Sequence, residues 1–439
     1  MIAVLLALAA FLIYHFTVHT IRNSRPLGGS NVNITRGTSA ESEASFAIDP
    51  ATPDVLFGAS SQLFTYRSTN GGRTWRKEAS PVVREPVCVR GEPHSGADKS
   101  REYLAFLVSP TCSDELRPYL VVTSRASGAR RWGAVTRVAP PKWPYGYDDA
   151  PSLVVDRHSG RLYLAWTRSL SEQASAIVLS ASDDRGQTWS SPVIVAPASG
   201  APHLSTIAVG PSGDVYVAGI DARHGVWITR STDQGRTFGP VQTAAPLRAN
   251  PSSNCAGQAN YSPLPTEETS CIGPNPTVLA TKTGIAVVYD DVGANQTPDV
   301  FVTTLDRGLR PRAHAQVNPP DKGATQQFFP AAGVDASTGV LWACWYDTTF
   351  DPNAHRAWFT CSASHDGRTW TPPERAAADP VHVSDLYTDI QGSTGFAPAV
   401  VADRGVAHAF WIGVNRTNFE QDIYTAALSE RKAFLTLQR

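Results

Sequence analysis

A unit of two apolar segments joined by a turn recurs along the chain and constrains the fold more than any other feature. Four copies are clear: APSLVVDRHSGRLYLAWTRS (150–169), NPTVLATKTGIAVVYDD (275–291), FPAAGVDASTGVLWACWYDT (329–348) and APAVVADRGVAHAFWIG (397–413). Each has proline at its second position, and proline at the first residue of a strand costs no ladder hydrogen bond. Internal similarity of this kind is typical of repeat architectures, so we expect one repeated β unit.

A third apolar segment follows each pair. These segments are LFTYRST, YLVVTSR, AIVLSAS, GVWITRS, DVFVTTL, AWFTCSA and DIYTAAL. They recur roughly every 50–70 residues, close to the ~40–50 residues of a propeller blade once long loops are allowed. The sequence therefore predicts an all-β fold, a β-propeller of four-stranded antiparallel blades. Seven blades are favoured and six are the alternative.

The turn after the third strand carries a motif of its own. Three copies share the pattern Ser-x-Asp/Asn-x-Gly-x-Thr-Trp/Phe, and a fourth is one residue shorter: STNGGRTW (68–75), SDDRGQTW (182–189), STDQGRTF (231–238) and SHDGRTW (364–370). The Asp or Asn side chain can accept backbone N–H groups of its own loop, and glycine permits positive φ. The aromatic ring can pack on the adjacent sheet. We therefore predict a structural role for Asn70, Asp184, Asp233 and Asp366.

This motif resembles the Asp-box, or BNR repeat, of the bacterial sialidase-like superfamily of β-propellers. The resemblance covers most of residues 42–430. It implies a propeller fold with a glycan ligand, and it places the Asp-box turns on the face away from the substrate.

Composition fits many short strands and excludes several classes. The 439 residues include 33 Gly and 33 Pro, which suits turns. The formal net charge is −1, and without a basic patch we expect no nucleic-acid partner. The sequence has no P-loop, dinucleotide fingerprint, HExxH or Gly-x-Ser-x-Gly motif. We expect no cofactor, with a structural Ca²⁺ as the one metal to consider.

The N-terminal segment and the cysteines indicate the cellular compartment in which the protein resides. Residues 1–21 read as a signal or membrane-anchor segment, 22–41 as a polar linker and 42–439 as the propeller. A cleaved signal and an uncleaved anchor both fit, and contact with a membrane is expected only through this segment. The six cysteines allow many pairings, of which proximity favours 88–112, 255–271 and 344–361, the last across a hairpin. Disulfides favour a secreted or membrane-anchored, extracytoplasmic protein.

Long polar loops point to the face opposite the Asp-box turns. In a propeller, the connections from second to third strand and from fourth strand to the next blade share one face, and function concentrates on such loops. Tyr-Asp pairs recur there, including Tyr147, Asp149, Asp290 and Asp347. They could form a ring suited to sugar hydroxyls or a cation, or they could each mark a strand end where Tyr packs and Asp caps a turn.

The resemblance implies specific roles for some residues. Retaining sialidases use Tyr as the nucleophile, a Glu to activate it, an Asp as acid/base and three arginines that grip the substrate carboxylate through their planar forks. The candidates are Tyr387 as nucleophile, Glu267 as base and Asp149 or Asp347 as acid/base. For substrate binding they are Arg168, Arg223, Arg248 and Arg356, with Tyr147 and Asp290. The Arg-Ile-Pro-like motif of true sialidases is missing near the first blade, where the sequence reads ITRGTSAESEASFAIDP.

Two functions remain open from the sequence. The first is an exo-acting glycoside hydrolase on sialylated or related glycans, which predicts arginines and a Tyr-Glu pair converging at the mouth. The second is a non-catalytic propeller that binds a glycan or a cell-surface protein. Either would be expected as a monomer.

Overall fold

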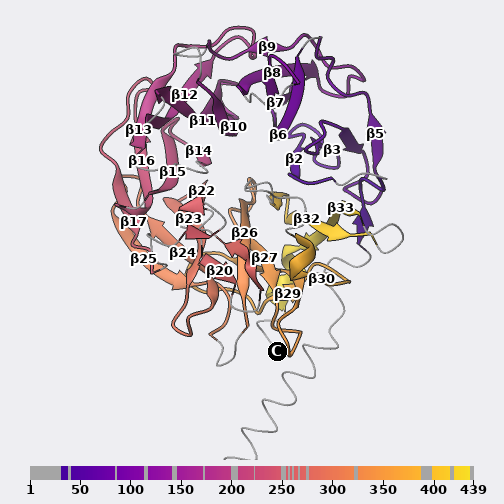
Figure 1. Ribbon diagram of the computed structural model, residues 1–439, viewed down its shortest axis with the longest axis vertical. Coiled ribbons are helices and arrows are strands. Elements are labelled where there is room, and N and C mark those ends of the chain that lie inside the picture. The colour runs from indigo at the N-terminus through magenta and orange to yellow at the C-terminus, as the bar shows by residue number, and fades with distance from the viewer. Residues whose placement is uncertain are drawn as a thin grey trace, which may run out of the picture.

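The computed structural model arranges seven antiparallel sheets radially around a central channel (Figure 1). This confirms the all-β propeller and the favoured count of seven blades among the described residues. The structure describes residues 31–435 except for 38–40, 85–86, 113–116, 141–145, 172–173, 199–205, 222, 249–253, 256–257, 260–261, 265–266, 273–275, 321–324, 387–397 and 416–419.

The first four blades follow one another in chain order, each from its innermost to its outermost strand. Blade 1 contains β2 (Ser45–Ile48), β3 (Leu56–Ala59), β4 (Thr65–Ser68) and β5 (Arg76–Glu78). Blade 2 contains β6 (Cys88–Ala97), β7 (Arg101–Ser109), β8 (Tyr119–Ala126) and β9 (Thr136–Arg137). Blade 3 contains β10 (Asp148–Val155), β11 (Leu162–Ser171), β12 (Ala174–Ser182) and β13 (Val193–Ala198). Blade 4 contains β14 (Thr206–Val209), β15 (Val215–Asp221), β16 (Gly225–Ser231) and β17 (Gln242–Ala245).

Two short hairpins then precede the remaining blades. They pair β18 (Asn254–Cys255) with β19 (Gln258–Ala259), and β20 (Ser262–Leu264) with β21 (Glu267–Ile272). Blade 5 contains β22 (Thr277–Ala280), β23 (Ile285–Val292), β24 (Pro298–Leu305) and β25 (Pro311–Gln316). Blade 6 contains β26 (Gln327–Val334), β27 (Leu341–Asp347), β28 (Arg356–Ser364) and β29 (Glu374–Arg375), with β30 (Val381–His382) also on β28.

Blade 7 closes the ring with both ends of the described chain. It contains β31 (Ala399–Asp403), β32 (Val406–Val414) and β33 (Gln421–Ser429), and its outermost strand is β1 (Val32–Asn33). Thr35 and Asn33 donate to the Asp422 carboxylate, at 2.6 and 2.7 Å. The propeller therefore begins before residue 42, because part of the segment expected as a linker pairs with the last blade. The described helices are short: η1 (Val383–Leu386) and α2 (Glu430–Leu435).

The packing explains why the strands read as continuous apolar runs rather than alternating ones. Successive side chains of a strand point to opposite faces, and each blade is covered on both faces by its neighbours. In β11, Leu162, Leu164 and Trp166 join a core shared with blade 2, whereas Tyr163 and Ala165 join one shared with blade 4. Burial between blades, rather than within one sheet, therefore supplies the hydrophobic core.

Two of the three predicted disulfides are present. Cys88 bonds to Cys112, and Cys344 bonds to Cys361 across the antiparallel pair β27–β28, with Cα atoms 4.0 Å apart. The side chains of Cys255 and Cys271 lie outside the described residues. Across the part of the chain that the structure describes, no helix is long and apolar enough to span a membrane.

Candidate active site

The channel contains a cavity of about 410 Å³ lined by the innermost strands of all seven blades and the residues just before them. Each of these strands starts at the end of the propeller that also holds the loops from second to third strand, because neighbouring strands are antiparallel. We call this end the mouth. The motif-bearing turns between third and fourth strands lie at the other end, which we call the turn face.

A backbone kink lies within the first half of several innermost strands. Glu92, Ala150 and Phe329 each precede a proline and adopt positive φ, at 50°, 48° and 49°. The strand register shifts at these positions, as expected for a β-bulge. Glu43 has the same backbone conformation, with φ of 55°, just before β2.

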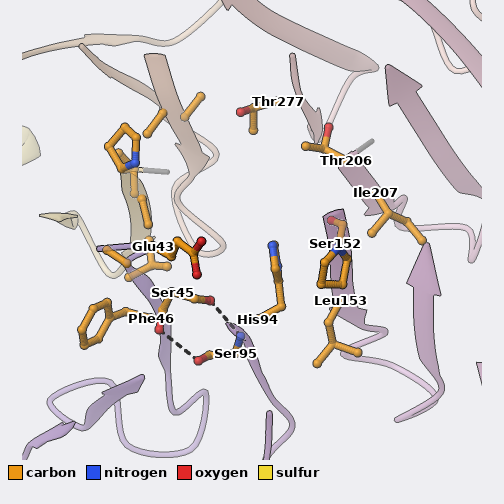
Figure 2. A pocket seen from close by; sticks show the side chains of 18 of the residues that line it. Glu43, Ser45, Phe46, His94, Ser95, Ser152, Leu153, Thr206, Ile207 and Thr277 are labelled. Atoms are coloured by element: carbon orange, nitrogen blue, oxygen red, sulfur yellow. Dashed lines mark hydrogen bonds between the residues drawn. The ribbon is translucent and has the colours of Figure 1, made fainter. Parts of the chain in front are cut away.

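At these kinks, backbone N–H groups donate hydrogen bonds to glutamate carboxylates of the preceding blade and so link neighbouring blades. The Glu92 N–H donates to Glu43 Oε2 at 2.7 Å, and the Ala150 N–H donates to Glu92 Oε2 at 2.7 Å. Below them, the Ser95 N–H donates to Ser45 Oγ at 2.8 Å (Figure 2). One carboxylate oxygen of each glutamate therefore accepts a backbone N–H from the next blade. These bonds hold both side chains in place on a rigid scaffold.

Three acidic groups meet at this place: Glu43, Glu92 and Asp149. Burial raises the pKa of Glu43 to about 7, although the hydrogen bond from the Glu92 backbone N–H acts in the opposite direction. Burial also raises the pKa of Glu92 well above its usual range, and the charge of Asp149 adds to the effect. Burial and the neighbouring Asp149 side chain therefore favour the protonated form of Glu92.

His94 shares the cavity with these acids. Figure 2 shows the His94 and Glu43 side chains directed into the same space. Burial lowers the pKa of His94 to about 4, so its imidazole is neutral at pH 7. A neutral imidazole offers one donor and one acceptor to a ligand.

The cluster lacks a metal-binding arrangement. Within the described ranges, no group of three or more His, Cys, Asp or Glu side chains is placed to hold a metal ion. The structural Ca²⁺ stays a prediction.

Of the predicted acids, Asp149 is the one that joins this cluster. Asp347 is buried at the end of β27 and accepts hydrogen bonds from Thr349 and Gln327. Burial raises its pKa. Asp290 is also buried and accepts the Phe329 N–H at 3.0 Å. None of Asp149, Asp290 and Asp347 lines the cavity directly, but Asp149 precedes Ala150, which does.

The four predicted arginines do not converge on one point. Arg168 is buried and forms a two-bond ion pair with Asp148, at 2.7 and 3.0 Å. Arg356 is exposed and pairs with Asp351 at 3.2 Å. The side chains of Arg223 and Arg248 are exposed, the latter over the Phe301 ring.

The remaining predicted residues lie at the surface or outside the described chain. Tyr147 is 42 % exposed beside the start of β10. Tyr387 and the side chain of Glu267 fall outside the described residues.

The motif turns form closely similar hydrogen-bond sets. Asp184 accepts the Thr188 N–H at 2.8 Å and the Thr188 hydroxyl at 2.6 Å, and Asp233 accepts the same pair from Thr237 at 2.9 and 2.6 Å. These bonds, led by the threonine hydroxyl, lower the pKa of Asp184 and bring that of Asp233 to about 2.

The other two motif turns use the same acceptor position. Asn70 and Asp366 accept the N–H groups of Thr74 and Thr369, at 3.0 and 2.8 Å. The motif side chains are thus engaged within their own turns.

The sequence interpretation missed Glu43, Glu92 and His94. A usable signal was present, because REPVCVRGEPHSG carries Glu92-Pro93 at the position that Ala150-Pro151 holds in the next blade. Aligning the prolines of successive units would have placed Glu92 beside Asp149 at the mouth.

Comparisons with known proteins support the fold. No family model and no curated protein sequence matches the chain. A GH93 α-L-arabinofuranosidase of Fusarium graminearum aligns with a TM-score of 0.50 and 12 % identity, over 92 % of this chain and 99 % of that one. A GH74 xyloglucanase of Xanthomonas campestris aligns with a TM-score of 0.50 and 16 % identity, over 90 % of this chain and 55 % of that one. A Trypanosoma rangeli sialidase aligns with a TM-score of 0.45 and 10 % identity, over 73 % and 56 %. At these identities the first two show a shared propeller fold.

Proposed function

We propose that this protein is an extracytoplasmic glycoside hydrolase that cleaves a neutral glycan at the channel mouth. The observation that carries the proposal is the acidic cluster of Glu43, Glu92 and Asp149, in which Glu43 and Glu92 line the cavity and burial raises the pKa of both. Most glycoside hydrolases place one carboxylic acid and one carboxylate on either side of the scissile bond. Environments that push neighbouring pKa values apart assign these two roles.

In this proposal Glu43 is the proton donor. Its pKa of about 7 matches the working range of a general acid near neutral pH. Its side chain points into the cavity, and the Glu92 N–H fixes one of its oxygens. Glu43 would donate its proton to the leaving-group oxygen as the glycosidic bond breaks.

Asp149 is the carboxylate partner, and Glu92 is a positioning residue. The raised pKa of Glu92 favours a protonated carboxyl group beside Asp149, and one Glu92 oxygen accepts the Ala150 N–H. Asp149 would act as the base that activates water or as the nucleophile. The stereochemistry of the product distinguishes these two mechanisms.

A neutral substrate fits this mouth better than a sialoside. A sialic acid carboxylate would have to approach three acidic groups. Of the predicted arginines, Arg168 and Arg356 already pair with Asp148 and Asp351. The cavity of about 410 Å³ lies within the ~300–1,000 Å³ of small-ligand sites. The two disulfides support an oxidising, extracytoplasmic location.

A second candidate is a binding propeller without turnover. It is favoured by the backbone bonds of Glu43 and Glu92, which join blades 1, 2 and 3 and would give both residues a structural role.

The test is a panel of fluorogenic glycosides that includes neutral pentosides, neutral hexosides and a sialoside. We expect release of the fluorophore from at least one neutral glycoside and none from the sialoside. Glu43→Gln should abolish the release while the melting temperature stays within a few degrees. Binding of a neutral glycan without hydrolysis across the panel would favour the binding propeller. Preferred cleavage of the sialoside would overturn the proposal.

A further inference from the structure

The turn face has a pocket of its own between blades 5 and 6. It has a volume of about 380 Å³ and is built from the first turns of both blades, at Lys282 and Gly339, and from the segments around Arg312 and Arg368. It is separated from the mouth by the length of the strands.

Cations surround this pocket without carboxylate partners. Lys282, Arg312 and Arg368 line it, and Arg307 lies next to it through a 2.9 Å hydrogen bond to the Lys282 carbonyl. Throughout the described chain, none of these four forms an ion pair with a carboxylate.

Their hydrogen bonds go to uncharged carbonyl oxygens. Lys282 Nζ donates to the carbonyls of Ser337 and Thr338, both at 2.9 Å. Arg312 donates to the Thr283 carbonyl at 3.2 Å, and Arg368 to the Arg312 carbonyl at 3.4 Å. These bonds orient the side chains. The carboxylates of Asp306 and Asp366 interact electrostatically with Arg312 and Arg368 but form no ion pair with them.

The two acids nearest the pocket are engaged by their own turns. Asp306 accepts the N–H groups of Gly308 and Arg310, at 2.8 and 2.9 Å. Asp366 accepts those of Arg368 and Thr369, at 2.7 and 2.8 Å. Three cations and one acid line the pocket, which leaves it positive in a chain whose formal net charge is −1.

The same face between other blades is built differently. Arg161 of blade 3 pairs with Asp183, and Arg230 of blade 4 pairs with Asp214 at 2.9 Å. Leu305 and His365 occupy, in blades 5 and 6, the motif position that Asp183 holds in blade 3. Neither Leu305 nor His365 supplies a carboxylate partner for the cations between blades 5 and 6.

We propose that this pocket is a second carbohydrate site that binds an acidic glycan through its sulfate or carboxylate groups. Guanidinium groups pair with such oxyanions through two parallel hydrogen bonds. Thr304 and Thr338 line the same pocket and offer hydroxyl groups to a sugar. His365 stands at the edge, its ring stacked on Phe434 at 4.1 Å. A nucleic acid is disfavoured, because the cations are confined to one pocket rather than spread along a groove.

The test is calorimetric titration of the full protein at low and at physiological salt. The probes are a heparin hexasaccharide, an oligogalacturonate, maltohexaose and a single-stranded oligonucleotide. We expect binding of the sulfated or the carboxylated oligosaccharide, weakened by salt, and none of maltohexaose at this site. Which of the two binds more tightly identifies the acidic group.

Two variants complete the test. The double substitution Arg312→Ala with Arg368→Ala should weaken that binding about tenfold or more. Arg230→Ala removes a cation of the same face that already has a carboxylate partner, and it should change the affinity less than about twofold. Both variants should melt like the parent protein. The proposal is overturned if neither acidic glycan binds, if Arg230→Ala weakens binding as much, or if the oligonucleotide binds as tightly as either glycan. Glycosidase turnover plays no part in this readout, so the two proposals fail separately.

Discussion

The two ends of the propeller shift the pKa values of their acidic side chains in opposite directions. At the mouth, burial raises the pKa of Glu43 to about 7. At the turn face, hydrogen bonds from Thr237 and Ser231 hold the pKa of Asp233 at about 2 in a solvent-accessible turn. The same chemical group can therefore hold a proton near neutral pH at one end, whereas it stays ionised at the other. The surroundings of a carboxyl group, rather than its presence in a repeated motif, indicate where chemistry is to be sought.

The largest difference expected between the two ends is in the effect of a substitution on turnover. We expect Glu43→Gln to lower kcat by roughly 10²–10⁴-fold, the usual contribution of a general acid. The matched change at the turn face, Asp184→Asn, should leave kcat within about twofold. Steady-state kinetics on the best neutral glycoside measures both. Equal losses from the two variants would show that the mouth acid has no special role.

The role of Glu92 is tested by a pair of substitutions. Gln can accept the Ala150 N–H through its carbonyl oxygen, and its amide can donate to Asp149 as a protonated carboxyl group would. We expect Glu92→Gln to keep activity within about tenfold and Glu92→Ala to lose about a hundredfold. The loss in the alanine variant should fall on kcat rather than KM. A positioning role would be refuted if Glu92→Gln were as inactive as Glu92→Ala.

At the turn face the expected effect is on stability. Asp184→Ala removes the acceptor of three hydrogen bonds, from Thr188 N–H, the Thr188 hydroxyl and the Ser182 hydroxyl. We expect the free energy of unfolding to fall by about 1–2 kcal/mol. Urea denaturation measures this change. An unchanged stability would mean that the turn does not need its motif side chain.

The smallest expected effect is the dependence of stability on pH, and its sign differs between the two ends. The pKa of Glu43 is raised in the folded state from its ordinary 4.5 to about 7. Its contribution to stability is therefore complete below about pH 4.5 and is lost as pH rises through 7. The pKa of Asp233 is lowered from 3.8 to about 2, so its contribution is present above about pH 4 and is lost as pH falls towards 2.

Melting temperatures measured across this pH range check both signs. Glu43→Gln should lose less stability than the parent protein between pH 5 and 7.5. Asp233→Asn should lose less than the parent between pH 4 and 2. A reversed order in either window would contradict the assigned pKa direction.

The fold followed from the sequence more completely than the site did. Blade number, strand order and the Cys344–Cys361 hairpin disulfide depend on repeats and local spacing, which a single sequence displays. The acidic cluster depends on three residues from different blades, brought together by the closure of the ring. The segment that contains β1 was predicted to be part of a linker. Its partner, β33, lies at the opposite end of the chain, so local sequence does not indicate the pairing. No periodicity within residues 22–41 reveals such a partner.

Charge partners were also invisible in the sequence. Arg168 looked available for a substrate, but Asp148 lies directly across the β10–β11 pair. The distinction between a paired and an unpaired cation needed the register of the strands.

The central claim is that the channel mouth holds a protonated carboxyl group at neutral pH, and infrared titration tests it most directly. Spectra of the parent protein and Glu43→Gln, recorded from pH 4 to 9, give the carboxyl band of Glu43 by difference. The account predicts a band that disappears with a midpoint at about pH 7. A Glu43 band that is already lost below pH 5 would contradict it.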